Sequence, residues 1–145
     1  MTTAEHISTK QSFVPLAGAS GRVPVFEGYS VPEGVFAGDP REQIYYILED
    51  AGLQTNVGYW EGAPGAIKFD GFPWNEFCAV IDGHLEVREQ GKPPLHLRAG
   101  QAFFIRKSFK GEWILHTVVK KYFVECLLDD VSIREQRPAL EVKKT

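Results

Sequence analysis

The chain has 145 residues, of which 43% are hydrophobic and 12% aromatic, and its formal net charge is −3. This length and composition predict one domain with a full core. The small negative charge argues against a nucleic-acid surface, which would be basic. No apolar run reaches the ~18 residues of a membrane helix, and the first residues lack the pattern of a signal peptide. We therefore expect a cytoplasmic protein that contacts neither membrane nor nucleic acid.

Composition divides the chain into three segments. Residues 1–24 are polar and contain glycines and prolines, which predicts an N-terminal arm, with an edge strand near residues 13–14. Residues 25–132 alternate short apolar runs with turn signals, the pattern of an all-β sandwich or barrel. Residues 133–145 are charged and contain Pro138, which predicts a surface strand or a loose tail.

Ten strands are predicted from runs of β-branched and aromatic residues. Their ranges are 35–36, 43–48, 55–61, 66–70, 75–82, 84–88, 95–98, 102–105, 111–119 and 121–128. Residues 50–52 and 90–93 are predicted to close hairpins, and Asp82–Gly83 has the sequence of a tight type I′ turn. Residues 41–50 could form a helix, but their isoleucines and tyrosines favour a strand.

Two blocks in the middle of the chain, one around Glu76 and one that follows Gly100, carry a more specific pattern. Glu76 lies seven residues before Gly83, and Gly100 opens the second block. This spacing resembles the two signature motifs of the cupin superfamily. It is most similar to the small cupins that include ureidoglycine aminohydrolase and the ethanolamine-utilisation cupin. Further stretches that resemble this subfamily are 57–61, 64–65, 111–113 and 121–124, so the resemblance covers roughly residues 50–128.

The resemblance implies an all-β, single-domain double-stranded β-helix, the RmlC-like cupin jelly-roll barrel, and a homodimer paired through an outer sheet. The three histidines that usually bind the cupin metal are absent. Asp70, Phe72 and Gly111 stand at their positions, whereas Glu76 keeps its place. No tightly bound cofactor is therefore expected. A divalent metal could be held weakly through Glu76 with Asp70, because two carboxylates lack the further oxygens that such ions prefer.

The remaining histidines fall outside the motif register. His84 follows the Asp82–Gly83 turn, and His96 and His116 occupy other strands. Side chains alternate between the two faces of a strand, so His116 is predicted to lie on the face opposite Trp113. A lone histidine on a strand is usually a surface or core residue. The sequence thus predicts no metal site from these three.

The same alternation predicts which side chains share the barrel interior. If Glu76 points inward, Cys78 does too, and Trp113 can line the same cavity. Asp70, Phe72 and Arg106 would lie at its mouth. Aromatic walls with a few polar groups are typical of small-molecule pockets, although a barrel also needs aromatic residues to fill it. The residues predicted to bind a ligand are Tyr59, Trp60, Asp70, Phe72, Trp74, Cys78, Arg106 and Trp113.

Glu76 is the predicted reactive group, because burial in an apolar barrel raises the pKa of a carboxyl group and suits it to acid–base work. Two structural readings stay open: a pair with a cation such as Arg106, or a hydrogen bond from a tyrosine. Arg106 could instead anchor an anionic ligand. Cys78 is not expected to act as a nucleophile, because no histidine is in register to activate it. The neighbouring lysines Lys120 and Lys121 are expected to be solvated.

Three functions follow from this pattern. The leading one is a cupin that binds a small polar or anionic molecule in its barrel without the usual metal. The second is an enzyme of the ureidoglycine aminohydrolase or ethanolamine-utilisation kind that uses Glu76. The third is a structural or regulatory protein with a filled barrel.

Overall fold

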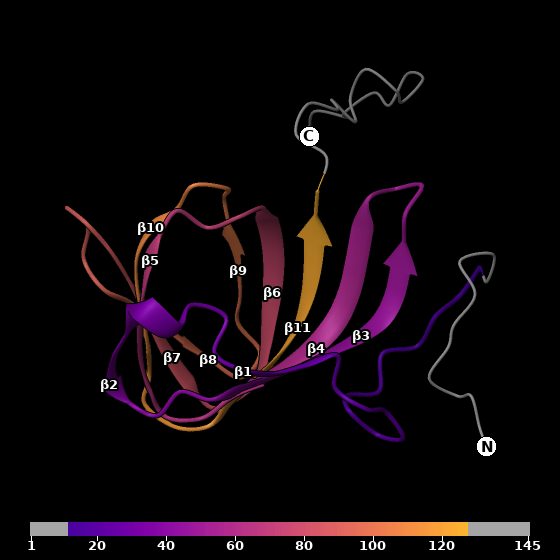
Figure 1. Ribbon diagram of the computed structural model, residues 1–145, viewed down its shortest axis with the longest axis horizontal. Helices are drawn as coiled ribbons and strands as arrows, with labels where there is room; N and C mark the ends of the chain where they lie inside the picture. The colour runs from indigo at the N-terminus through magenta and orange to yellow at the C-terminus, as the bar shows by residue number, and fades with distance from the viewer. Residues whose placement is uncertain (1–11, 128–145) are drawn as a thin grey trace, which may run out of the picture.

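The computed structural model describes residues 12–127, which form two facing antiparallel sheets (Figure 1). The six strands of the first sheet, in spatial order, are β1 (Phe26–Gly28), β3 (Glu42–Asp50), β4 (Thr55–Gly62), β11 (Val119–Cys126), β6 (Asn75–Asp82) and β9 (Ala102–Ile105). The five strands of the second are β2 (Val35–Gly38), β5 (Gly65–Asp70), β10 (Lys110–Leu115), β7 (His84–Glu89) and β8 (Leu95–Arg98). The predicted all-β jelly roll is thereby confirmed.

Helical structure is confined, within residues 12–127, to the 3-10 turn η1 (Pro32–Gly34) before β2. No helix in this part of the chain has the length and apolar character to cross a membrane. The segment 41–50, for which a helix was the alternative, is the strand β3 and pairs with β4. Its isoleucines and tyrosines therefore adopt the extended conformation that their β-branched and aromatic side chains favour.

The main core fills the space between the two sheets. It follows the two-residue period of the strands, and in β11 buried and partly buried residues alternate along the whole strand. Leu85, Trp113 and Phe123 belong to this core, each 3% exposed or less. A second, smaller cluster of Tyr45, Ile47 and Tyr59 lies on the other face of the first sheet.

The arm covers this second cluster without forming a strand. Val14 and Ala19 pack against the cluster, but no strand occurs at residues 13–14, so that prediction is wrong. A side chain satisfies the backbone of the arm instead: Tyr122 Oη accepts a hydrogen bond from the Gly18 amide at 2.9 Å and donates one to Leu16 O at 3.0 Å. The predicted tail, residues 133–145, lies outside the described residues.

Two chain reversals differ from the prediction because the chain changes sheets there. The predicted strand 111–119 is split: β10 ends at Leu115 in the second sheet and β11 begins at Val119 in the first. Gly83 likewise joins β6 to β7 across the sheets and closes no hairpin. Its φ is 98°, and a Cβ there would lie 2.2 Å from Val118 O, so this corner requires glycine. The hairpins at 50–52 and 90–93 are confirmed.

Candidate functional site: a charged cavity between the sheets

A cavity of about 210 Å³ lies between the sheets. Its walls combine aromatic rings with buried charges. The aromatic residues are Tyr46, Trp60, Phe69, Phe72, Trp74, Trp113 and Phe123, and the charged residues are Glu42, Glu76, Glu125 and Lys121. Such a mixture of apolar wall and a few convergent polar groups is typical of small-molecule sites.

Lys121 is the buried cation of this cavity. Its residue is 1% exposed, so the prediction that both neighbouring lysines are solvated is wrong for Lys121. The reason is strand alternation in β11, which pairs with β4 on one side and β6 on the other. Lys120 faces outward with a 41% exposed side chain, 3.7 Å from Glu61, and its neighbour must therefore face inward.

Glu76 and Cys78 hold the Lys121 ammonium group. Lys121 Nζ lies 3.2 Å from Glu76 Oε2 and 3.2 Å from Cys78 Sγ. The Cys78 thiol donates to the same carboxylate oxygen at 3.0 Å, and Trp74 Nε1 donates to Oε1 at 3.1 Å. Glu76 is thus paired with a cation, one of the two structural readings, but the cation is Lys121 and not Arg106. The hydrogen bond comes from a tryptophan, not a tyrosine.

The protonation of these groups follows from burial and from their neighbours. Burial raises the pKa of the Cys78 thiol, and the Lys121 charge offsets only part of that effect, so Cys78 stays a neutral thiol. Burial acts to lower the pKa of Lys121, and the Glu76 carboxylate beside it acts to raise it. Lys121 is therefore an ammonium ion at neutral pH. Neither residue is a ready nucleophile.

Two indole rings complete the environment of the ammonium group. Lys121 Nζ lies 4.7 Å from the centroid of the Trp60 ring and 4.9 Å from that of Trp113. At these distances the negative faces of the rings attract a cation. The rings themselves meet edge to face at 6.1 Å. The walls of the cavity are therefore built to accept positive charge.

Two further carboxylates face the cavity. Glu42 accepts hydrogen bonds from Ser30 N and Oγ, both at 2.8 Å, and from Trp60 Nε1 at 3.0 Å. Glu125 accepts from Tyr46 Oη at 3.0 Å and from Asn56 Nδ2 at 3.1 Å. Both glutamates are 5% exposed. Three carboxylates therefore share this cavity with one ammonium group, and the balance of formal charge among its lining residues is negative.

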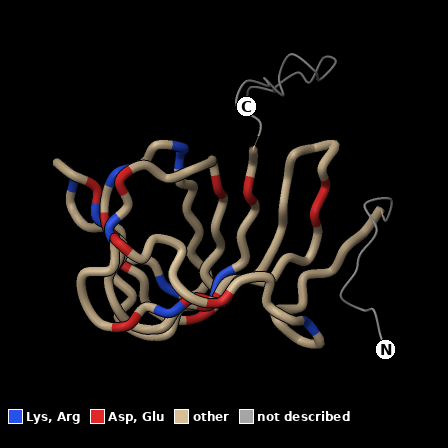
Figure 2. The backbone as a smooth tube through the Cα atoms, viewed as in Figure 1, with Lys and Arg blue, Asp and Glu red and all other residues tan. Residues whose placement is uncertain are grey.

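Glu125 and Glu76 are direct cross-strand neighbours on β11 and β6. Figure 2 shows acidic segments, in red, side by side on the neighbouring strands that Figure 1 labels β6 and β11. Burial raises the pKa of Glu125, and the Glu76 charge raises it further, while hydrogen bonds from Asn56 and Tyr46 and the charge of Lys121 act in the opposite direction. Like charges placed directly opposite destabilise a sheet. A positive ligand would relieve this repulsion.

Trp113 contributes an unused donor. Its side chain is 3% exposed and lines the cavity. Among residues 12–127 its Nε1 finds no hydrogen-bond acceptor. A buried donor without an acceptor costs about 1–3 kcal/mol. An oxygen atom of a bound molecule would satisfy this group after a turn of the ring that brings Nε1 to the cavity surface.

The structure brings together five of the nine sequence-predicted site residues at the cavity surface, namely Trp60, Phe72, Trp74, Glu76 and Trp113. Cys78 lies directly beneath them, fully buried and in contact with Lys121. The other three lie elsewhere. Tyr59 points to the opposite face of the first sheet and packs beneath the arm. The Asp70 side chain is 87% exposed near Lys110, so it does not join Glu76, and Arg106 lies exposed on the loop after β9.

Among the cavity residues that the prediction missed are Glu42, Tyr46, Lys121 and Glu125. One signal could have found two of them. In the stretch 119–126, Lys121 and Glu125 stand two residues on either side of Phe123, so all three share one strand face. Charged residues in phase with a buried aromatic residue indicate a polar interior. Glu42 and Tyr46 share the inward face of β3 in the same way.

The family described as the EutQ-like cupin domain matches residues 50–123, half of the chain. No curated protein matches the sequence. A putative ethanolamine utilization protein Q from Salmonella typhimurium is a similar solved structure, with 21% identity and a TM-score of 0.52 over 59% of this chain and 68% of that one.

Two other similar structures extend further over this chain. A Pseudomonas syringae protein of unknown function from the DUF861 family has 16% identity and a TM-score of 0.67, covering 76% of this chain and 46% of that one. A cupin-like protein from Thermotoga maritima has 16% identity and a TM-score of 0.57, covering 72% of this chain and 78% of that one. At these identities the likeness shows the fold.

Proposed function

The chain belongs to the EutQ-like cupin family, and on that premise we propose that its barrel cavity binds a small organic ammonium ion that also carries an oxygen acceptor. The single observation that carries the proposal is the charge of the cavity. Glu42, Glu76 and Glu125 are each 5% exposed and face one buried cation, Lys121. Buried charges need partners, and a second cation would supply the one that is missing.

The aromatic lining supports the same ligand class. Trp60 and Trp113 already hold one ammonium group by their ring faces, and Tyr46, Phe72 and Trp74 extend the wall. Carboxylates and ring faces together recognise ammonium ions. The volume of about 210 Å³ equals that of roughly seven water molecules. The ligand is therefore a molecule of few heavy atoms.

The oxygen acceptor follows from Trp113. Its indole N–H has no acceptor in the part of the chain that the structure describes. A hydroxyl or carbonyl oxygen on the ligand would accept that hydrogen bond, which a purely hydrocarbon cation could not do. An amino alcohol combines both features. Ethanolamine, which the name of the Salmonella neighbour contains, is the simplest probe of this class.

The other functions suggested by the sequence fit the geometry less well. An anionic ligand would need a free cation, but Arg106 lies away from the cavity and Lys121 is already paired with Glu76. Acid–base chemistry at Glu76 would need a free oxygen, yet both oxygens accept hydrogen bonds. A purely structural barrel would leave no cavity between the sheets. Binding of a cation is the function with the most support.

Isothermal titration calorimetry with three matched probes tests the proposal. Ethanolamine, ethylene glycol and glycolate have nearly the same size and differ in charge. We expect ethanolamine to bind, and the neutral and anionic probes to bind at least roughly 10-fold more weakly, because a charged hydrogen bond contributes about 1.5–3 kcal/mol. Affinity should rise as the pH rises through the raised pKa of Glu125, since its carboxylate is the form that attracts the cation.

Variants locate the site. Glu42→Gln and Glu125→Gln each remove one charge and keep an acceptor oxygen, and each should weaken ethanolamine binding roughly 10- to 100-fold. Glu89→Gln is the matched control, because Glu89 is partly exposed on β7 beside Lys92 and does not line the cavity. Tighter binding of glycolate than of ethanolamine would contradict the proposal, as would unchanged affinity in both cavity variants.

A further inference from the structure

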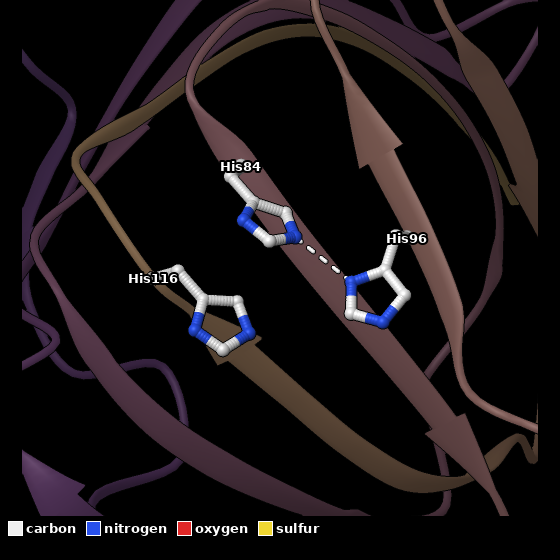
Figure 3. A group of neighbouring side chains, drawn as sticks. All are labelled: His84, His96 and His116. Atoms are coloured by element: carbon white, nitrogen blue, oxygen red, sulfur yellow. Dashed lines mark hydrogen bonds between the residues drawn. The ribbon is translucent and has the colours of Figure 1, made fainter.

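Three histidines meet on the outer surface of the second sheet, away from the cavity. Figure 3 shows His84 on β7, His96 on β8 and His116 just after β10 with their rings grouped together. One nitrogen from each ring lies within 4.8 Å of the nitrogens of the others. His84 is half-buried and the other two are exposed. None of the three lines the cavity between the sheets.

Strand pairing brings these residues together. β7 pairs with β8, and His84 lies opposite Arg98. His96 lies opposite Glu86, two residues after His84 on β7, so His96 and His84 are diagonal neighbours on the same face of the sheet. On the other side of β7 the His116 amide donates to His84 O at 3.0 Å. Leu85 points to the core, and the histidine side chains therefore project outward. Residues 32 positions apart in the chain become neighbours on one face.

The rings are close enough to share an ion. His84 Nε2 lies 2.8 Å from His96 Nδ1, and the centroids of the His84 and His116 rings are 4.4 Å apart. Around tetrahedral Zn²⁺, with Zn–N distances of about 2.0–2.1 Å, ligand nitrogens lie about 3.3 Å apart. The His84–His96 nitrogen separation of 2.8 Å is shorter than this value, and all three ligand nitrogens lie within 4.8 Å of one another. Rotations of exposed side chains would place the three nitrogens on one ion.

A buried carboxylate orients the third ring. His116 Nε2 lies 2.8 Å from Glu86 Oε1, and Glu86 is only 4% exposed. Arg88 Nε donates to the other oxygen at 2.6 Å and fixes the carboxylate. A carboxylate that accepts from one ring nitrogen leaves the other free to bind a metal, the arrangement found behind metal-binding histidines in many proteins. Figure 3 shows that Nε2 of His116 faces the other two rings, so this exposed ring must turn to bring its free Nδ1 to a shared ion.

We propose that His84, His96 and His116 form a divalent transition-metal site, filled by Zn²⁺, in which Glu86 orients His116 and the fourth position is taken by water. Three neutral imidazoles suit zinc, copper and nickel, and three protein ligands with one exchangeable position describe an open zinc site. The site lies outside the barrel and shares no residue with the cavity. Its failure would leave the proposed ammonium binding untouched, and the reverse holds too.

Metal competition on the full chain tests the proposal. Protein stripped with EDTA and then dialysed is titrated with Zn²⁺ against a chromophoric chelator. We expect one equivalent of Zn²⁺ to bind. Loss of a residue that hydrogen-bonds to a metal ligand typically weakens metal binding 10–100-fold. His84→Gln, His96→Gln and His116→Gln each remove a ligand itself, and each should weaken binding by more than that. Glu86→Gln, which keeps an acceptor for His116, should fall within that 10–100-fold range. Co²⁺ in place of Zn²⁺ should give the visible absorption of a four-coordinate site.

Matched controls separate this site from other donors. His6→Gln removes the fourth histidine of the sequence, and Cys126→Ser removes the more accessible cysteine. Both should leave Zn²⁺ affinity within about twofold of wild type. One of the three ligand positions is half-buried and the other two are exposed, so their variants are expected to fold, and far-ultraviolet circular dichroism checks this. Absence of stoichiometric binding would overturn the proposal, as would affinity that survives all three histidine changes.

Discussion

At the scale of single residues, the burial of Lys121 and Glu76 is the most demanding feature of this protein. Their side chains are 2% and 6% exposed, and Lys121 Nζ lies 3.2 Å from Glu76 Oε2. A buried pair contributes little net stability, because desolvation offsets the attraction, but removing one partner leaves an uncompensated charge. The main effect of the pair is therefore to set the shape and the charge of the cavity.

Lys121→Met should lower the free energy of unfolding by about 3–5 kcal/mol, because it leaves the buried Glu76 carboxylate without a cation partner. The double variant Lys121→Met/Glu76→Met should lose less than Lys121→Met alone, since no buried charge remains. Urea denaturation of Lys121→Met, of Glu76→Met and of the double variant measures the coupling. Lys120→Met, at the exposed neighbouring position, should change stability by no more than about 0.5 kcal/mol. Additive losses in the double variant would refute this account.

At the scale of elements, β11 organises both faces of the first sheet. Its inward residues, Lys121 and Phe123, belong to the cavity, and its outward residue Tyr122 fastens the arm. The Tyr122 ring also packs edge to face on Tyr59 at 5.8 Å. The Tyr122 hydroxyl group therefore adds two hydrogen bonds to the packing of Val14 and Ala19 that holds the described part of the arm.

Tyr122→Phe should release the arm while keeping the ring in place. Loss of the two hydrogen bonds should lower stability by roughly 1–3 kcal/mol, and hydrogen exchange should become faster at the Gly18 amide, whose acceptor is gone. Amide exchange followed by mass spectrometry of the arm peptides measures this. Tyr29→Phe is the control, because its hydroxyl group bonds to Asp39 and not to the arm. Equal exchange in wild type and Tyr122→Phe would count against a role of the Tyr122 hydroxyl group in holding the arm.

At the scale of the whole molecule, burial makes the folded state hold its protons tightly. Burial is the largest cause that raises the pKa of Tyr46, Tyr59 and Cys78 above their ordinary values of 10.0, 10.0 and 9.0. A group with a raised pKa binds its proton more tightly in the folded state than in the unfolded state. Its contribution to stability is complete below the unfolded pKa and is lost as the pH rises above it.

The free energy of unfolding should therefore fall steadily above about pH 9, starting with the thiol and continuing as the tyrosines begin to ionise in the unfolded chain. Urea denaturation between about pH 7 and pH 11 measures the slope. Tyr46→Phe removes one of these protons and should make the loss over that range smaller than in wild type. Stability that stays flat or rises across this range would contradict the prediction.

The β-rich fold and several site residues could be predicted from the sequence. The strands 75–82, 95–98 and 102–105 have the predicted bounds, because the two-residue period and the turn residues around them are local signals. The resemblance of Glu76, Gly83 and Gly100 to the cupin motifs is confirmed by the family match. Phe72, Trp74 and Trp113 were predicted near Glu76 and do line its cavity.

The partners of these residues could not be predicted, because each contact joins separate strands. Periodicity says which side chains share a face, but not which face turns inward. Tyr59 and Trp60 were both predicted to line the cavity, and of the two only Trp60 does so. The charged partner of Glu76 comes from 45 positions along the chain, where Lys121 stands beside a lysine that faces solvent.

The sequence by itself determined the β architecture and the cupin spacing, since these depend on local propensity and on residues close together in the chain. Only the tertiary structure decided the charge of the cavity and the meeting of the three histidines. Strand order and register bring β11 beside β6 and bring His84, His96 and His116 to one surface. Pairing between distant strands is set by how the whole chain buries its apolar surface, and no short stretch of sequence contains that information.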